Sequence, residues 1–278
     1  MRELLELRTS EEEARQYLPP GIGKTLPMGL VRQLFLDVGD PLVERLRSLE
    51  AEHRARGTTL FTLCEASRRY TSRELLAAEF LKVEFWPFFQ PTGEECGTEY
   101  DESTASPCCG VGARQVSPLR LELRRIPRSR DIALSMGGEY VISQRLARAL
   151  EQHRITGYQL QPIFSKGGRP TEDWFQLILP SDCVEMVPPT RFGSDYLAPE
   201  PDSSRCPQGH VAGHQLISPV HISRDSLNGN DWAFTRQRLG LRMGLIRPYP
   251  LMIISQRLYR LLKEMKVRNL HAEVAHPV

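Results

Sequence analysis

The pattern of apolar residues predicts two helices and a strand in the N-terminal part of the chain. Leucines recur at helical spacing after Asp40, which suits an N-cap, and Pro41 suits the first helical position. Thr71 and Glu74 form a capping box that begins a second helix. The next segment, 81–89, is rich in aromatic and branched residues and ends at a proline, which is typical of a strand. Its aromatic side chains could stack on nucleobases, but packing in the core is the favoured interpretation.

Three short sequence elements each occur twice, in the same order, in the C-terminal part of the chain. They are a Ser-Pro pair between a branched and an aliphatic residue, an Asp-x-Ala tripeptide and an Ile-Ser-Gln-Arg-Leu pentad. The first copies begin at Ser117, Asp131 and Ile142, and the second copies begin at Ser218, Asp231 and Ile254. Such recurrence is typical of an internal repeat. The pentads are farther apart than the Ser-Pro pairs, so we expect an insertion in the second copy, in the loop around Asn228 and Gly229.

Each pentad predicts a junction between a strand and a helix. Its serine follows a branched apolar pair that suits a strand, and the hydroxyl can accept a hydrogen bond from the first free amides of a helix. We therefore expect Ser143 and Ser255 to be equivalent N-caps, followed by helices and then by strands at 158–163 and 270–274.

Composition and charge exclude several classes of protein. The chain has 278 residues, of which 40% are hydrophobic and 25% charged, as in ordinary soluble globular proteins. Its 36 basic and 34 acidic residues do not give the positive balance of a dedicated nucleic-acid binder. The segment 1–15 is rich in glutamate and cannot be a signal peptide, and no later run is apolar enough to span a bilayer. We therefore expect a cytoplasmic protein.

Two of the cysteine-containing segments look like knuckles of a zinc ribbon. One is Cys206-Pro207-Gln208-Gly209-His210, in which a tight turn offers a thiol and an imidazole. The other, Ser106-Pro107-Cys108-Cys109-Gly110, has serine where the first cysteine of such a knuckle is expected. Two turns of this kind can place four soft or borderline ligands around one tetrahedral ion.

The knuckles predict the metal ligands. We expect Cys109, Cys206 and His210 to bind one structural zinc ion, with Cys108 or Cys96 completing the shell. His214 is a further candidate for the fourth position. The alternative is an empty, relic knuckle whose cysteines only pack. Cys64 and Cys183 lie outside the knuckles, and we interpret them as packed thiols in a reducing compartment.

These features together predict an α+β fold with two related strand–helix–strand units around a zinc-ribbon-like centre. The expected domains are an N-terminal helix and strand region at 1–90, a first repeat unit with a degenerate knuckle at 91–187, and a second repeat unit at 188–278.

A dense run of arginines is the most distinctive charged feature. It contains Arg114, Arg120, Arg124, Arg125, Arg128 and Arg130. These side chains could bind phosphates or an acidic protein partner. They could also point outward from a strand whose inner face is formed by Leu119, Leu121 and Leu123.

The catalytic motifs that we considered each fail at a named residue. Gly23-Lys24-Thr25 lacks the first glycine and the preceding strand of a phosphate-binding loop. His210 and His214 have the spacing of a helical metalloprotease motif, but no glutamate adjoins His210 and the glycines nearby oppose a helix. The sequence has no glycine-flanked serine nucleophile and no dinucleotide fingerprint. We therefore expect no catalytic residues.

The knuckles, the Ser-Pro strands and the repeated pentads together resemble the bacterial double-CxxCG-motif proteins. The resemblance covers about residues 90–278, and the chain departs from the family pattern at Ser106 and at His210. It implies a small non-enzymatic immunity protein, or antitoxin, that binds and neutralises a cognate toxin. The alternative prediction is a nucleic-acid-associated zinc-ribbon protein that uses the arginine run, and a weaker one is an enzyme with an unrecognised site.

Overall fold

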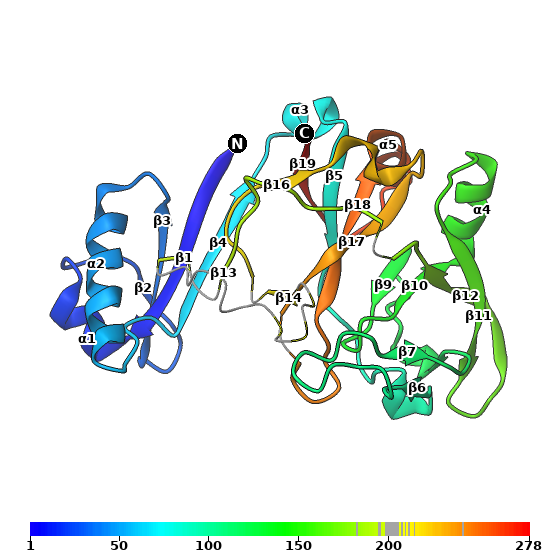
Figure 1. Ribbon diagram of the computed structural model, residues 1–278, viewed down its shortest axis with the longest axis horizontal. Helices are drawn as coiled ribbons and strands as arrows, with labels where there is room; N and C mark the ends of the chain where they lie inside the picture. Colours follow the sequence, from blue (N-terminus) through cyan, green and yellow to red (C-terminus); the bar gives the residue numbers. More distant parts are fainter. Residues whose placement is uncertain are drawn as a thin grey trace.

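The computed structural model describes residues 1–181, 183–193, 196–197, 206, 208, 210, 212–213, 215–240 and 242–278. These residues form a mixed α+β protein (Figure 1). The α-helices of the described residues are α1 (Glu11–Tyr17), α2 (Pro41–Ala55), α3 (Ser72–Ala77), α4 (Gln144–Gln152) and α5 (Gln256–Glu264). None of the helices in these ranges is both long enough and apolar enough to cross a membrane.

The N-terminal sheet is antiparallel and has the strand order β2-β3-β1-β4. Its strands are β1 (Arg2–Ser10), β2 (Lys24–Thr25), β3 (Val31–Asp37) and β4 (Leu63–Arg69). Leu5 and Leu7 of β1 share one core with Ala14 of α1 and with Val43 and Leu46 of α2. The alternation of apolar residues along β1 therefore buries one face of the sheet against the two helices.

The two helices predicted from their caps are present. The Asp40 carboxylate accepts a hydrogen bond from the backbone amide of Leu42 at 2.9 Å, and α2 begins at the next residue, Pro41. Thr71 and Glu74 form the reciprocal capping box at the start of α3. These caps are local interactions, which is why the sequence was sufficient to predict them.

The central sheet has the strand order β14-β17-β18-β5-β19-β16. Its strands are β5 (Phe80–Phe85), β14 (Ala212–Gly213), β16 (Val220–Ile222), β17 (Trp232–Leu239), β18 (Tyr249–Ser255) and β19 (Leu270–Pro277). Strand β5 ends earlier than the predicted strand 81–89. It lies between β18 and β19 and is antiparallel to both. The domain boundary predicted at residue 90 therefore separates β5 from the strands with which it pairs.

The third sheet has the strand order β8-β11-β12-β10-β9. Its strands are β8 (Arg120–Leu121), β9 (Ile132–Leu134), β10 (Tyr140–Ser143), β11 (Gln159–Ser165) and β12 (Pro170–Ile178). Strand β12 lies between β11 and β10 and is antiparallel to both. Strand β8 is parallel to β11, as β16 is parallel to β19 in the central sheet. Figure 1 shows the N-terminal sheet at one end, the sheet containing β5 in the middle and this sheet at the other end.

Both pentads form the predicted junction between a strand and a helix. The hydroxyl of Ser143 caps α4 by accepting from the amide of Leu146 at 3.2 Å, and Ser255 caps α5 by accepting from Leu258 at the same distance. Ser143 also donates to Asp131 at 2.7 Å, and Ser255 donates to Asp231 at 2.7 Å. The strands predicted after the two helices correspond to β11 and β19.

The insertion expected around Asn228 and Gly229 is elsewhere. Asp131 and Ser143 are 12 residues apart, whereas Asp231 and Ser255 are 24 apart, so the additional residues lie after Asp231. They form the longer hairpin between β17 and β18. The prediction was wrong because an Asn-Gly pair indicates a turn but carries no information about a length difference.

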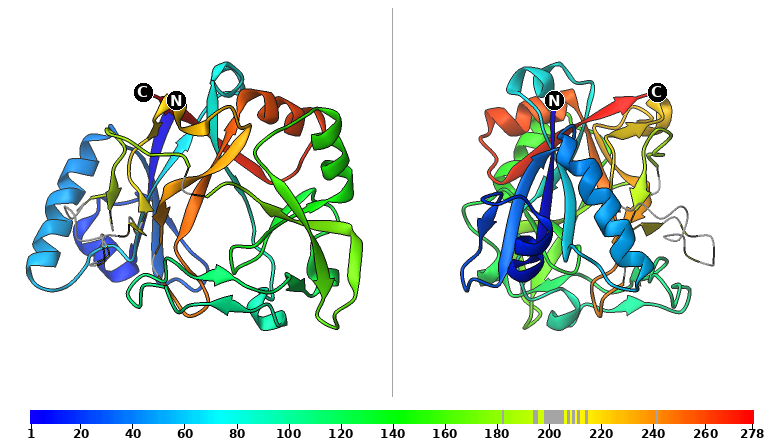
Figure 2. Two further views of the ribbon diagram at one scale, coloured as in Figure 1. Left: turned by 45° about the vertical axis from the view of Figure 1, so that its right-hand side comes forward. Right: turned by 90° about the vertical axis from the view of Figure 1, so that its left-hand side faces the viewer.

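Helices α4 and α5 share one hydrophobic core, to which both the central and the third sheet contribute. Leu146 of α4 and Leu258 of α5 are fully buried in it, and Figure 2 shows the two helices side by side. Two equivalent hydrogen bonds link the ends of these helices. In each, an arginine at the start of one helix donates to a backbone carbonyl just after the C-terminal end of the other helix. Arg145 donates to the Met265 carbonyl at 3.2 Å, and Arg257 donates to the Arg154 carbonyl at 2.6 Å.

The β17–β18 hairpin reaches the first knuckle. Arg242 pairs with Glu102 at 2.8 Å, and Arg247 pairs with Glu94 at 3.2 Å and also with Glu102. The short elements around these contacts and in the following loops are η1 (Glu94–Cys96), β6 (Tyr100–Asp101), β7 (Arg114–Gln115), η2 (Leu123–Arg125), β13 (Phe192–Gly193), β15 (Gln215–Leu216) and η3 (Arg224–Leu227).

Candidate metal centre

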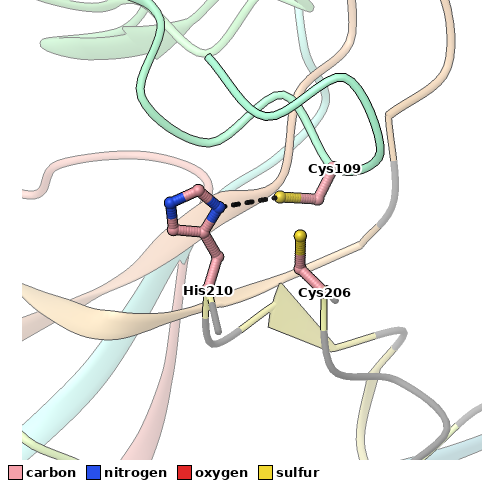
Figure 3. A group of neighbouring side chains, drawn as sticks. All are labelled: Cys109, Cys206 and His210. Atoms are coloured by element: carbon pink, nitrogen blue, oxygen red, sulfur yellow. Dashed lines mark hydrogen bonds between the residues drawn. The ribbon is translucent and has the colours of Figure 1, made fainter. Parts of the chain in front are cut away.

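Three of the predicted metal ligands converge on one point. One ligand atom each from Cys109, Cys206 and His210 lies within 4.8 Å of the other two (Figure 3). The Cys109 sulfur is 3.7 Å from Nδ1 of His210. Both cysteines are buried, whereas His210 is partly exposed. The group could therefore hold a metal ion between two loops that are about a hundred residues apart in the sequence.

A tight turn in the first knuckle directs Cys109 into the group. The amide of Gly110 donates to the carbonyl of Ser106 at 2.7 Å, and the amide of Ser106 donates to the carbonyl of Val111 at 2.9 Å. Gly110 has a φ of +73°, a conformation that glycine adopts without steric cost. Its missing side chain also leaves room for Arg242, because an added Cβ would lie 3.2 Å from the Arg242 side chain.

Ser106 occupies the position at which the first cysteine of the knuckle is expected. Its side chain is buried, and its oxygen lies 3.1 Å from the sulfur of Cys206 and 3.4 Å from the amide of Cys109. The serine thus contacts both thiol-bearing residues of the group. The sequence showed Ser106 only as a missing ligand, and its contact with Cys206 could not be anticipated from spacing.

The surroundings of Cys206 favour its thiolate. The hydrogen bond from Ser106 is the main cause that lowers the pKa of the Cys206 thiol to about 6, with further contributions from the backbone of Gln208 and from His210 and Cys109. The thiolate is the form of cysteine that binds metal ions. The donor set therefore fits a soft or borderline cation.

The candidates for a fourth ligand are placed differently. Cys108 is exposed and, like Cys96, is not part of the group of three. Partial desolvation together with the neighbouring Cys206 and Cys109 raises the pKa of its thiol. Cys96 is buried at the end of η1, and the structure does not bring it into the group of three. His214 lies outside the described residues. Of the two candidates named for completing the shell, Cys108 is the one next to Cys206.

The two cysteines expected to pack as thiols lie in hydrophobic surroundings. Cys64 belongs to the core of the N-terminal sheet, and Cys183 packs against the cluster that contains Val220 and Leu251 of the central sheet.

The arginine run is mostly exposed. Arg114, Arg120, Arg124, Arg125 and Arg128 are exposed, and Arg130 is half-buried, with its guanidinium donating to the carbonyl of Pro87. Leu119 and Leu121 are fully buried on either side of Arg120, so the expected alternation holds around β8. It ends there, because the chain turns into the short helix η2, where Leu123 is only partly buried.

Part of the run gathers at one open hollow near the start of α4. Arg124, Arg128 and Arg130 line this hollow together with Arg145 of the first pentad. Two carboxylates, Asp131 and Asp173, also line it, and Arg145 is paired with Asp131. Arg145 was not among the site residues predicted from the sequence. The recurrence of an aspartate followed by a pentad arginine was the signal that could have identified this pair.

Comparison of the sequence with known proteins does not assign the chain to a family. No protein-family model matches the chain, and no curated protein matches it.

Proposed function

We propose that the protein is a non-enzymatic interaction protein of the toxin-immunity type, stabilised by a structural zinc ion. The observation that carries this proposal is the convergence of Cys109, Cys206 and His210, which come from two loops far apart in the sequence. A metal bound there cross-links the loops and holds the surface around them in one shape. That is the contribution a structural metal makes to a binding protein.

The chemistry of the donors favours zinc. Two thiolates and an imidazole are typical ligands of structural zinc, and a fourth protein ligand closes the shell in such sites. We assign that place to Cys108, since it lies beside Cys206. A closed shell leaves no position for a substrate, so the site supports binding and not turnover.

We further infer that the central and third sheets are two copies of one unit around this centre. The third sheet, read as β9-β10-β12-β11-β8, corresponds to the strands β17-β18-β5-β19-β16 of the central sheet, including the parallel pair at one edge. The central sheet has β14 as an additional strand beside β17. The pentad serines and their aspartates make the same hydrogen bonds in both. In this interpretation, β5 has the same position in the second copy as β12 has in the first.

The arginine run supplies the surface for a partner. Arg124 and Arg125 are exposed on η2, and arginine is favoured at the energetic centres of protein interfaces. We therefore assign an acidic protein partner, a toxin or effector, to this surface. The same side chains would also contact phosphates, so binding to nucleic acid is the competing outcome.

The experiment is a protection assay. Cells that express the full chain are challenged with the toxin candidate encoded beside it, and the double variant Arg124→Glu with Arg125→Glu is compared with wild type. We expect the variant to lose protection and partner capture, with nearly unchanged melting temperature because both side chains are exposed. Arg45→Glu with Arg73→Glu, two exposed arginines outside the run, is the matched control and should protect fully.

Three results would count against the proposal. One is protection by the Arg124 and Arg125 variant equal to that of wild type, which would remove the surface assignment. Another is tight binding of DNA or RNA that weakens steeply with salt, which would favour the nucleic-acid alternative. The third is substrate turnover that is lost on mutation of His210, which would show an enzyme.

A further inference from the structure

A second site, unrelated to the metal centre, lies where the two C-terminal sheets meet. A cavity of about 120 Å³ is enclosed by the end of β5, the turn between β9 and β10, and the start of β18. Among the described residues, none of the candidate metal ligands lines it. A cavity of about 150 Å³ is large enough to hold a benzene molecule. The present cavity is somewhat smaller, so it suits a compact head group with fewer heavy atoms than benzene.

Aromatic residues contribute a large part of the apolar cavity lining. Phe85, Trp86, Phe88, Tyr140 and Tyr249 all line it. The rings of Trp86 and Phe88 are 4.1 Å apart between centroids. Trp86 and Tyr249 are each 43% exposed, so the wall continues to the surface and the cavity is accessible from solvent. The faces of such rings carry negative potential and attract a desolvated cation.

One acidic group stands at this wall. The Glu84 carboxylate lines the cavity and accepts from the indole nitrogen of Trp86 at 3.3 Å. Burial raises the pKa of Glu84, but Lys82 at 3.2 Å, the Trp86 indole and His271 together lower it by more, so the carboxylate is charged at neutral pH. Lys82 is shared with Glu273 at 3.0 Å. One ammonium thus faces two carboxylates.

The ion pairs of Lys82 continue through Glu273 to Arg68, and His271 of β19 is the register partner of Glu84. Arg68 pairs with Glu3 at 2.7 Å and lies 3.8 Å from Glu273. Together with Lys82 and Glu84, these groups include two cations and three anions. The local balance is therefore negative.

Arg247 also lines the cavity, but its charge is engaged elsewhere. Its guanidinium pairs with Glu94 and Glu102 and lies over the ring of Tyr100, 4.8 Å from the ring centroid. Two carboxylates therefore compensate this cation on the side where it points. The cavity offers a guest aromatic faces and the unbalanced charge beside Glu84.

We propose that this cavity binds a trimethylammonium head group, either of a free small molecule or of a trimethylated lysine. The aromatic faces provide dispersion and cation–π attraction, and Glu84 provides a counter-charge that a neutral guest of the same shape could not use. This inference does not rest on the proposed function, since it uses neither the metal ligands nor the arginine run.

The test compares two isosteric probes by isothermal titration calorimetry on the full chain. Choline carries the positive charge, and 3,3-dimethylbutan-1-ol has the same shape and hydroxyl without the charge. We expect choline to bind at one site at least tenfold more tightly than the alcohol. A peptide containing trimethyllysine is compared with the same peptide containing unmodified lysine. This comparison shows whether the head group comes from a modified protein or from a free small molecule.

Variants locate the binding. Trp86→Leu removes an exposed ring while keeping apolar volume, and Glu84→Gln removes the counter-charge; each should abolish the preference for choline. Phe35→Leu, at an exposed ring of the N-terminal sheet, is the matched control and should bind as wild type does.

The melting temperature of each variant is measured in parallel, and Trp86→Leu keeps the test valid if Glu84→Gln disturbs the ion pairs. Equal binding of the neutral alcohol, no binding of choline or the trimethyllysine peptide, or an unchanged preference in a folded Trp86→Leu variant would each overturn the proposal.

Discussion

Ser106 determines which ligands the first knuckle can offer to a metal ion. It stands where a knuckle would have its first cysteine, yet its side chain points to the same place, 3.1 Å from the Cys206 sulfur. A serine hydroxyl is a much weaker zinc ligand than a thiolate, but it can donate a hydrogen bond that stabilises the Cys206 thiolate. At this position the serine therefore offers a hydrogen bond to a neighbouring candidate ligand in place of a thiolate.

This geometry predicts that Ser106→Cys strengthens metal binding. The new thiolate would replace the exposed Cys108 as the fourth ligand, because position 106 is buried and its side chain is already directed at the Cys206 sulfur. We expect zinc affinity to rise at least tenfold, measured by competition with a chromogenic chelator. Ser103→Cys adds a thiol to an exposed position of the same loop and should leave the affinity unchanged. Equal affinities of Ser106→Cys and wild type would contradict the assignment of the ligand positions.

At the scale of elements, the sequence predicted what is set by local interactions. Asp40, Thr71, Ser143 and Ser255 were identified as N-caps because a cap needs only the residues of the next turn. The position of β5 could not be predicted in this way. Its partners β18 and β19 lie far along the chain, and no periodicity within β5 identifies them.

The same distinction between local and long-range interactions applies to the candidate metal centre. The knuckle turns specified Cys109, Cys206 and His210, which the structure brings together. The fourth place depends on how the two loops approach one another, which spacing does not determine. Cys96 and Cys108 were therefore indistinguishable from the sequence, although only Cys108 is beside Cys206.

The pentad caps can be tested by substitution. Ser143→Ala and Ser255→Ala should each lower the free energy of unfolding by about 1 kcal/mol, because each removes the acceptor for the first free amides of a helix. The measurement is equilibrium denaturation in urea. Ser129→Ala, at an exposed serine, is the control and should have little effect. A loss at one pentad serine but not at the other would weigh against the inference that the two units are equivalent.

At the scale of the whole molecule, two of the contacts between the two C-terminal sheets differ in character. The helices α4 and α5 share a hydrophobic core and exchange reciprocal hydrogen bonds at their ends. The second connection is polar and consists of the β17–β18 hairpin with its ion pairs to Glu94 and Glu102, next to the candidate metal centre. The hydrophobic joint can persist without a metal, so loss of the metal should weaken the molecule without unfolding it.

Metal removal therefore gives the last prediction. Protein purified without chelator should contain about one zinc ion per chain, and a strong chelator should lower its melting temperature by several degrees, because an ion that binds only the folded state stabilises that state. Cys109→Ser should melt at the lower temperature from the outset and be insensitive to the chelator. Cys96→Ser is the matched control: it alters a buried thiol outside the group, so it should remain sensitive to the chelator whatever its own stability. If wild-type protein contains no metal and melts at the same temperature with and without chelator, the cysteines only pack together and the zinc assignment is wrong.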